Sequence, residues 1–216
     1  MSDVEIRVLY QDDALLVCRK PTGVSSEEGG MGRLLAGQGL GTCYCVHRLD
    51  RAVGGVMVYA RTAPAAAALS AAIAARAMDK GYLAVVQGRP AEDAAVLRDL
   101  LYHDAAKNKS YVVSRPRRGV REAELRYTLL ACRSAEELSL LRVRLHTGRS
   151  HQIRVQLASR GLPLAGDRRY GSRLAGELAL WSESLRFPHP LDGRELRFSA
   201  PPPAQWPWTL FGLHNN

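Results

Sequence analysis

Hydrophobic positions along the chain cluster in short runs of strand length. Such runs cover residues 4–10, 14–19, 55–60, 82–86, 124–131 and 138–145. In the last run, apolar residues at positions 141, 143 and 145 alternate with basic ones at 142, 144 and 146. This alternation predicts a strand with one buried face and one solvated, basic face.

Two segments carry the signals of a helix. Thr62 offers an N-cap oxygen ahead of an Ala-rich run that continues to Met78, and the apolar positions 69, 73 and 77 form one core stripe. Ser150 is expected to cap a second helix that continues to about Arg160, where Gly161 stops it. Strands interleaved with only two clear helices predict an α+β fold, and we expect a single domain over residues 1–216.

The remaining segments lack a clear period. Residues 25–42 are rich in Gly and predict either an ordered loop or a flexible crossing segment. Residues 103–121 are interpreted as a basic loop inside the domain, and the Pro-rich stretch 201–207 as an extended segment packed on the surface.

Charge directs attention to a polyanion. Lys and Arg total 30 against 21 Asp and Glu, which gives a net charge of +9 and a pI near 9.8. Release of counterions from phosphates favours binding of such a protein to nucleic acid, although an Arg-rich genome gives the same composition. The spacing of the four cysteines is poor for zinc, and an acidic start without a long apolar run predicts a cytoplasmic protein with no membrane segment.

The run from Val46 to Asp50 is the first candidate for chemistry. It precedes an apolar strand, and Gly54 and Gly55 lie between, so the Asp50 carboxylate is expected in a tight turn with Arg48 close to it. The alternative is an Asp–Arg pair that only stabilises the loop.

Three further groups have both a functional and a structural interpretation. Arg149, Ser150, His151 and Arg154 lie near one helix start and suit an anion, but they also suit a simple polar helix start. Tyr82 opens a strand, where a tyrosine is usually structural. The basic loop suits an RNA backbone and an unstacked base, but a solvated charge run explains it nearly as well. Its residues are Lys107, Lys109, Arg115, Arg117, Arg118 and Arg121, with Tyr111 among them.

Five segments, in a fixed order, resemble the motifs of the RluA-type family of pseudouridine synthases. They are VLYQDDALLVCRKPTGV, VHRLDRAVGGVMVYART, DKGYLAVVQG, LHTGRSHQIRVQLASRGLPLAGDRRYGS and LRFPHPLDGRELRFSAPPP. The His-Arg-Leu-Asp form of the second segment is similar to RluA rather than to the sister RsuA group. The resemblance spans roughly residues 7–203.

The resemblance implies a role for each matching residue. Asp50 matches the catalytic Asp, and Arg48 the Arg that enters the RNA stack. Tyr82 matches the Tyr that stacks on the flipped base and is a candidate for proton removal, and Arg154 the Arg that pairs with the catalytic carboxylate, so Asp50, Tyr82 and Arg154 are the expected catalytic residues. We place His47, Arg149 and His151 with Arg48 and the basic loop on the RNA-contacting side. The family fold is α+β, with a mixed, largely antiparallel central sheet, flanking helices and an RNA-binding cleft. No S4-type extension is expected before Val8.

The implied reaction breaks the N1–C1′ bond of uridine, rotates the uracil and joins C5 to C1′. Nothing is oxidised or hydrolysed overall, so we expect no cofactor and no metal. The carboxylate can act as a nucleophile at C1′ or as a base at C2′, and the sequence leaves both routes open. The expected partner is a tRNA or ribosomal RNA stem-loop, with no obligate protein partner and a monomeric enzyme.

Two departures from the family pattern and one rival function remain. Val53-Gly54 stands where Thr-Ser is usual, and Trp181 where a His is common. The rival is a catalytically silent RNA-binding or RNA-folding protein of the same fold. The intact Asp50 counts against it, because RNA binding alone does not need a carboxylate in a cleft for phosphates. A base-excising glycosidase or a nuclease is more remote, since no supporting carboxylate cluster accompanies Asp50.

Overall fold

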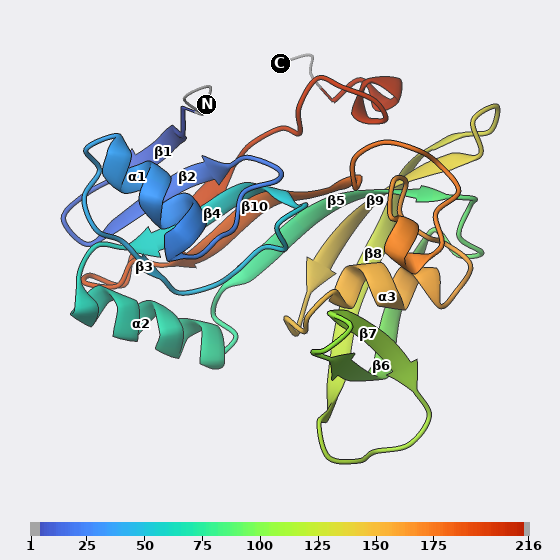
Figure 1. Ribbon diagram of the computed structural model, residues 1–216, viewed down its shortest axis with the longest axis horizontal. Helices are drawn as coiled ribbons and strands as arrows, with labels where there is room; N and C mark the ends of the chain where they lie inside the picture. The colour runs from blue at the N-terminus through green and yellow to red at the C-terminus, as the bar shows by residue number, and fades with distance from the viewer. Residues whose placement is uncertain (1–4, 214–216) are drawn as a thin grey trace. The chain divides into compact units, whose positions relative to one another are not determined.

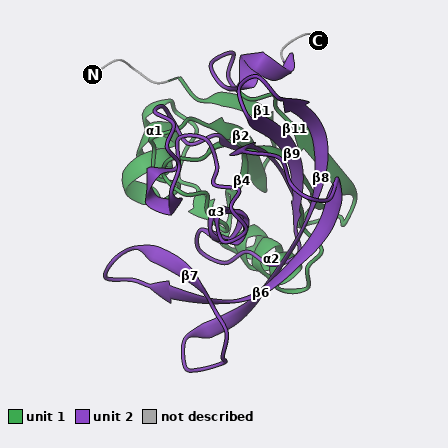
Figure 2. Cartoon of the chain, turned by 90° about the vertical axis from the view of Figure 1, so that its right-hand side faces the viewer, with its two compact units in different colours: residues 1–80, 181–202 green, residues 81–180, 203–216 purple. Residues whose placement is uncertain are grey.

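A computed structural model describes residues 5–213, which form two compact units (Figures 1 and 2). Unit 1 comprises the chain up to Lys80 together with Trp181–Pro202. Unit 2 comprises Gly81–Leu180 together with the residues from Pro203 onward. The single-domain prediction stays a prediction, because one domain can itself contain two compact units.

Unit 1 contains a sheet with the strand order β1-β2-β4-β10, in which β3 also pairs with β4 and β11 with β10. Only β4 and β10 run parallel among these neighbours. The strands are β1 (Arg7–Gln11), β2 (Leu15–Lys20), β3 (Tyr44–Cys45), β4 (Gly54–Ala60), β10 (Leu180–Pro188) and β11 (Glu195–Ser199). The helical elements are a π-helical turn η1 (Glu28–Gly32), α1 (Arg33–Gly37) and α2 (Ala63–Ala74).

Helix α2 begins as predicted and ends earlier. The Thr62 side chain accepts a hydrogen bond from the Ala65 backbone N–H at 3.3 Å, which confirms the N-cap. Ala65 and Leu69 are buried in a core cluster with Val58 of β4. The predicted end at Met78 is wrong, because Arg76 takes a left-handed conformation with φ of 59° and stops the helix.

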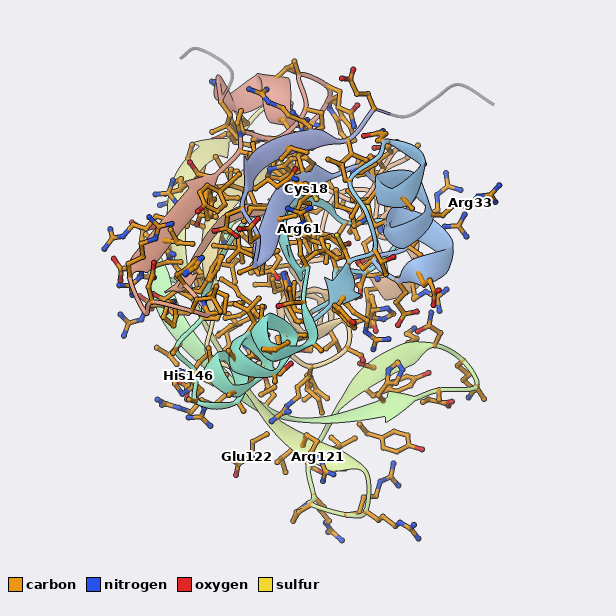
Figure 3. All side chains as sticks on the ribbon, turned by 90° about the vertical axis from the view of Figure 1, so that its left-hand side faces the viewer. Cys18, Arg33, Arg61, Arg121, Glu122 and His146 are labelled. Atoms are coloured by element: carbon orange, nitrogen blue, oxygen red, sulfur yellow. The ribbon has the colours of Figure 1, made fainter. Side chains whose placement is uncertain are left out.

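The Gly-rich segment 25–42 is more ordered than either interpretation of it. It contains η1 and α1, with Met31 and Leu35 fully buried. Arg33 points outward from the helix in Figure 3. Buried apolar residues four apart therefore made one helical turn here despite the glycines. Of the predicted strand 4–10, Val4 lies outside the described residues, and β1 starts at Arg7.

Unit 2 contains a sheet with the strand order β5-β9-β8-β6-β7, in which β9, β8, β6 and β7 are antiparallel. Its strands are β5 (Asp79–Gln87), β6 (Ala94–Asp104), β7 (Lys109–Val113), β8 (Val120–Arg133) and β9 (Leu138–Leu145). Its helical elements are α3 (Gln152–Ala158), η2 (Arg168–Tyr170) and η3 (Trp208–Phe211). The α+β class with a mostly antiparallel sheet is confirmed.

One face of this sheet carries α3. Val155 of α3 packs against Leu101 of β6 and Ala123 of β8. In β9, Leu141 and Val143 are buried while the basic residues at 142 and 144 are exposed, so the predicted alternation is confirmed. No helix within residues 5–213 is both long and apolar enough to cross a membrane.

The interpretation of 103–121 as one basic loop is wrong. Residues 94–104 and 109–113 pair as the antiparallel hairpin β6–β7, with Tyr102 opposite Tyr111. A short connection over 114–119 then leads into β8. The hairpin was missed because its exposed strands do not alternate cleanly between apolar and polar residues.

Candidate active site

The loop that carries Asp50 is fixed by backbone hydrogen bonds in unit 1. The Ser26 hydroxyl accepts from the Leu49 N–H at 3.0 Å and donates to the Leu49 carbonyl at 2.8 Å, and both residues are buried. The next carbonyl, that of Asp50, accepts from the Val53 N–H at 2.8 Å and closes the predicted turn. Asp50 itself is half-buried, and these hydrogen bonds fix the backbone on both sides of it.

A buried lysine provides positive charge beside Asp50. The Lys20 side chain is fully buried, and its ammonium donates to the carbonyls of Pro21, Val24 and Arg51 at 2.9, 2.7 and 3.4 Å. Burial lowers the pKa of Lys20 from 10.5 to about 8, and the charge of Asp50 opposes that decrease. Local sequence patterns did not single out this lysine as a site residue. Its place in the Lys-Pro-Thr-Gly motif was the available signal.

A pH change should test this lysine. Above about pH 8 the ammonium of Lys20 loses a proton, which leaves fewer donors for three carbonyls and removes the charge of Lys20 from beside Asp50. We expect the single-turnover rate to fall several-fold between about pH 7 and 9. The unfolded chain binds this proton more tightly, so the contribution of Lys20 to stability rises over the same range and unfolding does not explain the loss. A Lys20→Met variant with the same pH step would contradict this expectation.

Two of the residues that depart from the family pattern, Gly54 and Trp181, pack against each other. A Cβ atom on Gly54 would lie 2.5 Å from Cζ3 of Trp181, so only glycine leaves room for the indole. The indole N–H donates to the carbonyl of Ala200 at 2.9 Å, and the guanidinium of Arg19 lies 4.8 Å from the ring centroid.

This packing makes a stability prediction. Gly54→Ser should lower the free energy of unfolding by about 1–3 kcal/mol, because it overpacks the site. Adding Trp181→His, which restores the family pair, should recover most of that loss in urea unfolding. Additive effects of the two substitutions would show that the sites are independent.

Arg48 and His47 lie in the same loop in different environments. The Arg48 side chain is exposed, and its guanidinium lies 2.7 Å from the carboxylate of Glu27. The His47 ring is buried, and its Nε2 accepts a hydrogen bond from the Val58 N–H at 3.2 Å. Burial lowers the pKa of His47 to about 3, so the ring is neutral. The neutral, buried ring anchors the loop to β4, and the RNA contact of His47 stays a prediction.

In unit 2, Tyr82 and Arg154 are both buried. Tyr82 lies on β5 with 6% of its surface exposed. Arg154 lies on α3 and donates from Nε and Nη2 to the two carboxylate oxygens of Asp167, at 2.7 and 2.8 Å. The family resemblance implies only the catalytic carboxylate as the partner of Arg154. Asp167 is a further partner, and it belongs to the Gly-Asp-Arg-Arg-Tyr-Gly stretch of a matching motif.

The start of α3 differs from the prediction. His151, not Ser150, occupies the N-cap position, with a left-handed φ of 54° and no capping side chain. Gln152 organises this turn: its side-chain oxygen accepts from the Thr147 hydroxyl and the Arg149 N–H. His151 is buried and its ring contacts Tyr170, and its direct contact with RNA stays a prediction. Arg149 is exposed, as an RNA contact requires.

The basic residues of the predicted loop are distributed over the β6–β7 hairpin, the 114–119 connection and the start of β8. Lys107, Arg115, Arg117 and Arg118 are exposed, and Lys109 is half-buried. Figure 3 shows Arg121 at the start of β8, in the part of the unit that contains the light green hairpin strands. Unit 2 has 18 Lys and Arg residues against 10 Asp and Glu, whereas unit 1 has 12 against 11, so almost all the excess positive charge belongs to unit 2. Within residues 5–213 no group of three or more His, Cys, Asp or Glu side chains is arranged to hold a metal ion.

The motif order, the Asp50 loop and the fold can be compared with known proteins. The family model described as RNA pseudouridylate synthase matches residues 14–159. The chain belongs to this family. It is an RNA pseudouridine synthase, an isomerase that acts on RNA, so the predictions of family, fold and enzyme class are confirmed.

Curated relatives cover most of the chain. It is 31% identical to the uncharacterized RNA pseudouridine synthase YhcT of Bacillus subtilis, over 93% of this chain and 70% of that protein. It is 34% identical to ribosomal large subunit pseudouridine synthase D of Xanthomonas campestris pv. campestris, over 93% of this chain and 67% of that protein. The structure of human RNA pseudouridylate synthase domain containing 1 has the same fold, with a TM-score of 0.81 at 21% identity, and covers 95% of this chain and 86% of that one.

Proposed function

We propose that this synthase converts specific uridines in a tRNA or ribosomal RNA stem-loop to pseudouridine, as a monomer, with Asp50 as the catalytic carboxylate. The observation that carries the proposal is the Asp50 loop: the Ser26 hydroxyl binds the N–H and the carbonyl of Leu49, and the Asp50 carbonyl accepts from the Val53 N–H, so the backbone that holds Asp50 is fixed. A carboxylate carried on a fixed loop suits a group that must meet the sugar of the target nucleotide.

Each step of the reaction has a candidate residue. The target base must leave the RNA stack, at a cost of a few kcal/mol, before the glycosidic bond is accessible. The exposed Arg48 is the candidate for insertion into the stack, and Tyr82 for stacking on the flipped base. Asp50 then acts at the ribose, as a nucleophile at C1′ or as a base at C2′. Arg154 is the candidate for holding that carboxylate ionised.

The ion pair between Arg48 and Glu27 is compatible with insertion of Arg48 into RNA. In the protein alone, the Arg48 guanidinium pairs with Glu27, and both side chains are more than half exposed. An exposed pair of this kind contributes only about 0–1 kcal/mol, so RNA can replace Glu27 at little cost.

The test is to incubate the purified protein with transcripts of tRNA and of ribosomal RNA fragments, without added cofactor or metal. Pseudouridine would be mapped by carbodiimide labelling and reverse-transcription stops. The names of relatives such as ribosomal large subunit pseudouridine synthase D favour ribosomal RNA as the first substrate to try. A site-specific stop would support the proposal and identify the RNA. Release of free uracil would instead indicate a glycosidase, and tight binding without modification would favour the silent binder.

The connection between β7 and β8 should contribute to RNA affinity through phosphate contacts. Replacing Arg115, Arg117 and Arg118 together by Gln should weaken binding and reduce the slope of log Kd against log salt by about 2–3, since each phosphate contact contributes roughly 0.7–0.9. Filter binding over a salt series measures this slope. The control is Arg194→Gln and Arg197→Gln in unit 1, where carboxylates of Asp192 and Glu195 already pair with these arginines. An unchanged slope in the triple variant would exclude the connection from the interface.

A further inference from the structure

Tyr170 of η2 lies against the buried pair formed by Arg154 and Asp167. The centroid of its ring is 5.1 Å from the guanidinium carbon of Arg154. Nε and Nη2 of the same guanidinium both donate hydrogen bonds to the Asp167 carboxylate. Asp167 also fixes the backbone of this turn, because its carbonyl accepts from the Tyr170 N–H at 3.1 Å. One short turn therefore supplies both the anion and the aromatic face that hold Arg154.

The Tyr170 hydroxyl connects that pair to the β6–β7 hairpin. It accepts a hydrogen bond from the Ser110 N–H of β7 at 2.7 Å and lies 2.9 Å from Nδ1 of His151, at the start of α3. The Ser110 hydroxyl donates to the Ser150 carbonyl at 2.6 Å, and Ser110 is almost fully buried. The hairpin is thus joined to the beginning of α3 both directly, through Ser110, and through the Tyr170 phenol, which contacts both elements.

The same turn also holds the tip of the hairpin. The Arg169 guanidinium donates to the carbonyls of Lys107 and Asn108, both at 2.9 Å. The ammonium of Lys109 lies 5.4 Å from the centroid of the Tyr170 ring, which Arg154 also contacts. Two cations therefore use one ring, and one of them belongs to the strand that we assign to RNA binding.

We propose that Tyr170 is a positioning residue that couples the hold of the β6–β7 hairpin on RNA to the orientation of Arg154. When a phosphate draws Lys109 toward the RNA, the hairpin moves or tightens on the Tyr170 hydroxyl, and the ring that supports the Arg154 guanidinium follows. Binding at the hairpin then favours the productive placement of Arg154. This inference rests on the proposed function of Arg154 and of the hairpin.

A purely structural tyrosine would give a different result. It would contribute to stability, and its loss would change neither the rate of the folded enzyme at saturating RNA nor the RNA affinity. Tyr127 is a suitable control for that case, since it is buried in unit 2 and its hydroxyl donates to the Glu92 carbonyl at 3.1 Å. Tyr127→Phe removes one buried hydroxyl bond far along the sheet from η2, on residues with no proposed part in RNA binding or catalysis.

The experiment compares Tyr170→Phe, which keeps the ring, with Tyr170→Leu and Tyr127→Phe. Single-turnover rates at saturating RNA and RNA Kd values are measured well below the melting temperature of each variant. Tyr170→Phe should raise Kd and lower the saturating rate, each by about fivefold, the effect of losing one buried hydrogen bond. Tyr170→Leu should lower the rate further, because Arg154 loses its aromatic face. Tyr127→Phe should match the wild-type protein in both quantities.

Two outcomes would overturn the coupling. The first is a folded Tyr170→Phe protein whose rate and Kd equal those of Tyr127→Phe. If Tyr170→Phe does not fold, Arg169→Gln releases the hairpin tip without touching a buried group, and a wild-type saturating rate in that variant is the second. Absence of pseudouridine with the wild-type enzyme on every RNA would instead refute the proposed function. The Kd effect of Tyr170→Phe would still be measurable in that case.

Discussion

Asp50→Asn should reduce pseudouridine formation by at least about 10³-fold, because a neutral amide neither attacks C1′ nor removes a proton from C2′. RNA affinity should stay within a few-fold of the wild-type value. The loop should keep its path, since the hydrogen bonds of the Ser26 hydroxyl and of the carbonyl of residue 50 are unchanged in this variant. Release of tritium from C5-tritiated uridine in a single turnover measures the rate, and filter binding measures the affinity.

The matched control for this charge change is Asp13→Asn. Asp13 is an exposed carboxylate of unit 1 in the turn between β1 and β2. It should keep wild-type rate and affinity. Retained activity in Asp50→Asn would remove Asp50 from the chemistry. A large loss of affinity in Asp50→Asn would mean that the carboxylate organises the RNA surface, and the catalytic group would then have to be sought elsewhere.

Local patterns predicted the strands and the start of one helix well, because they depend on neighbouring residues. The alternation in β9 reports which face is buried, and the Thr62 cap needs only the N–H of Ala65. The end of α2 was misjudged because the stop comes from a left-handed Arg76, a residue type that gives no such signal. The β6–β7 hairpin was missed because pairing with neighbouring strands, rather than the local sequence pattern, determines that these residues form strands.

The site residues that the sequence did not reveal are those defined by tertiary contacts. Lys20 acquires its role through three carbonyls on two loops, and Asp167 through an arginine on another element. Both stood inside matching motifs, which marks them as candidates but does not name a partner. Burial had the opposite effect on two histidines: His47 and His151 lie beside functional residues in the sequence, yet their rings point into the protein. Proximity in the sequence therefore does not indicate which of these side chains is exposed.

Arg154→Met should be the most destabilising substitution at the site, lowering the free energy of unfolding by about 3–5 kcal/mol. Asp167 has only 1% of its side chain exposed, so the substitution leaves a buried carboxylate without its bidentate partner. Urea unfolding followed by circular dichroism measures the loss. A comparable Arg–Asp pair in the same unit provides the control: Arg160 binds both oxygens of Asp99 at 2.9 and 3.2 Å, but its side chain is 35% exposed. Arg160→Met should cost about 1 kcal/mol or less and leave the rate unchanged.

The double variant Arg154→Met/Asp167→Leu separates stability from catalysis. Replacing both members of a buried ion pair by apolar residues is often neutral for stability, because no charge is left without a partner. We therefore expect the double variant to recover most of the stability lost in Arg154→Met and to remain inactive on RNA. Inactivity in a stable protein would mean that the guanidinium acts in the reaction rather than only in the fold. If activity returned together with stability, Arg154 would be a structural residue, and Asp50 would need another cation, for which Lys20 is already adjacent.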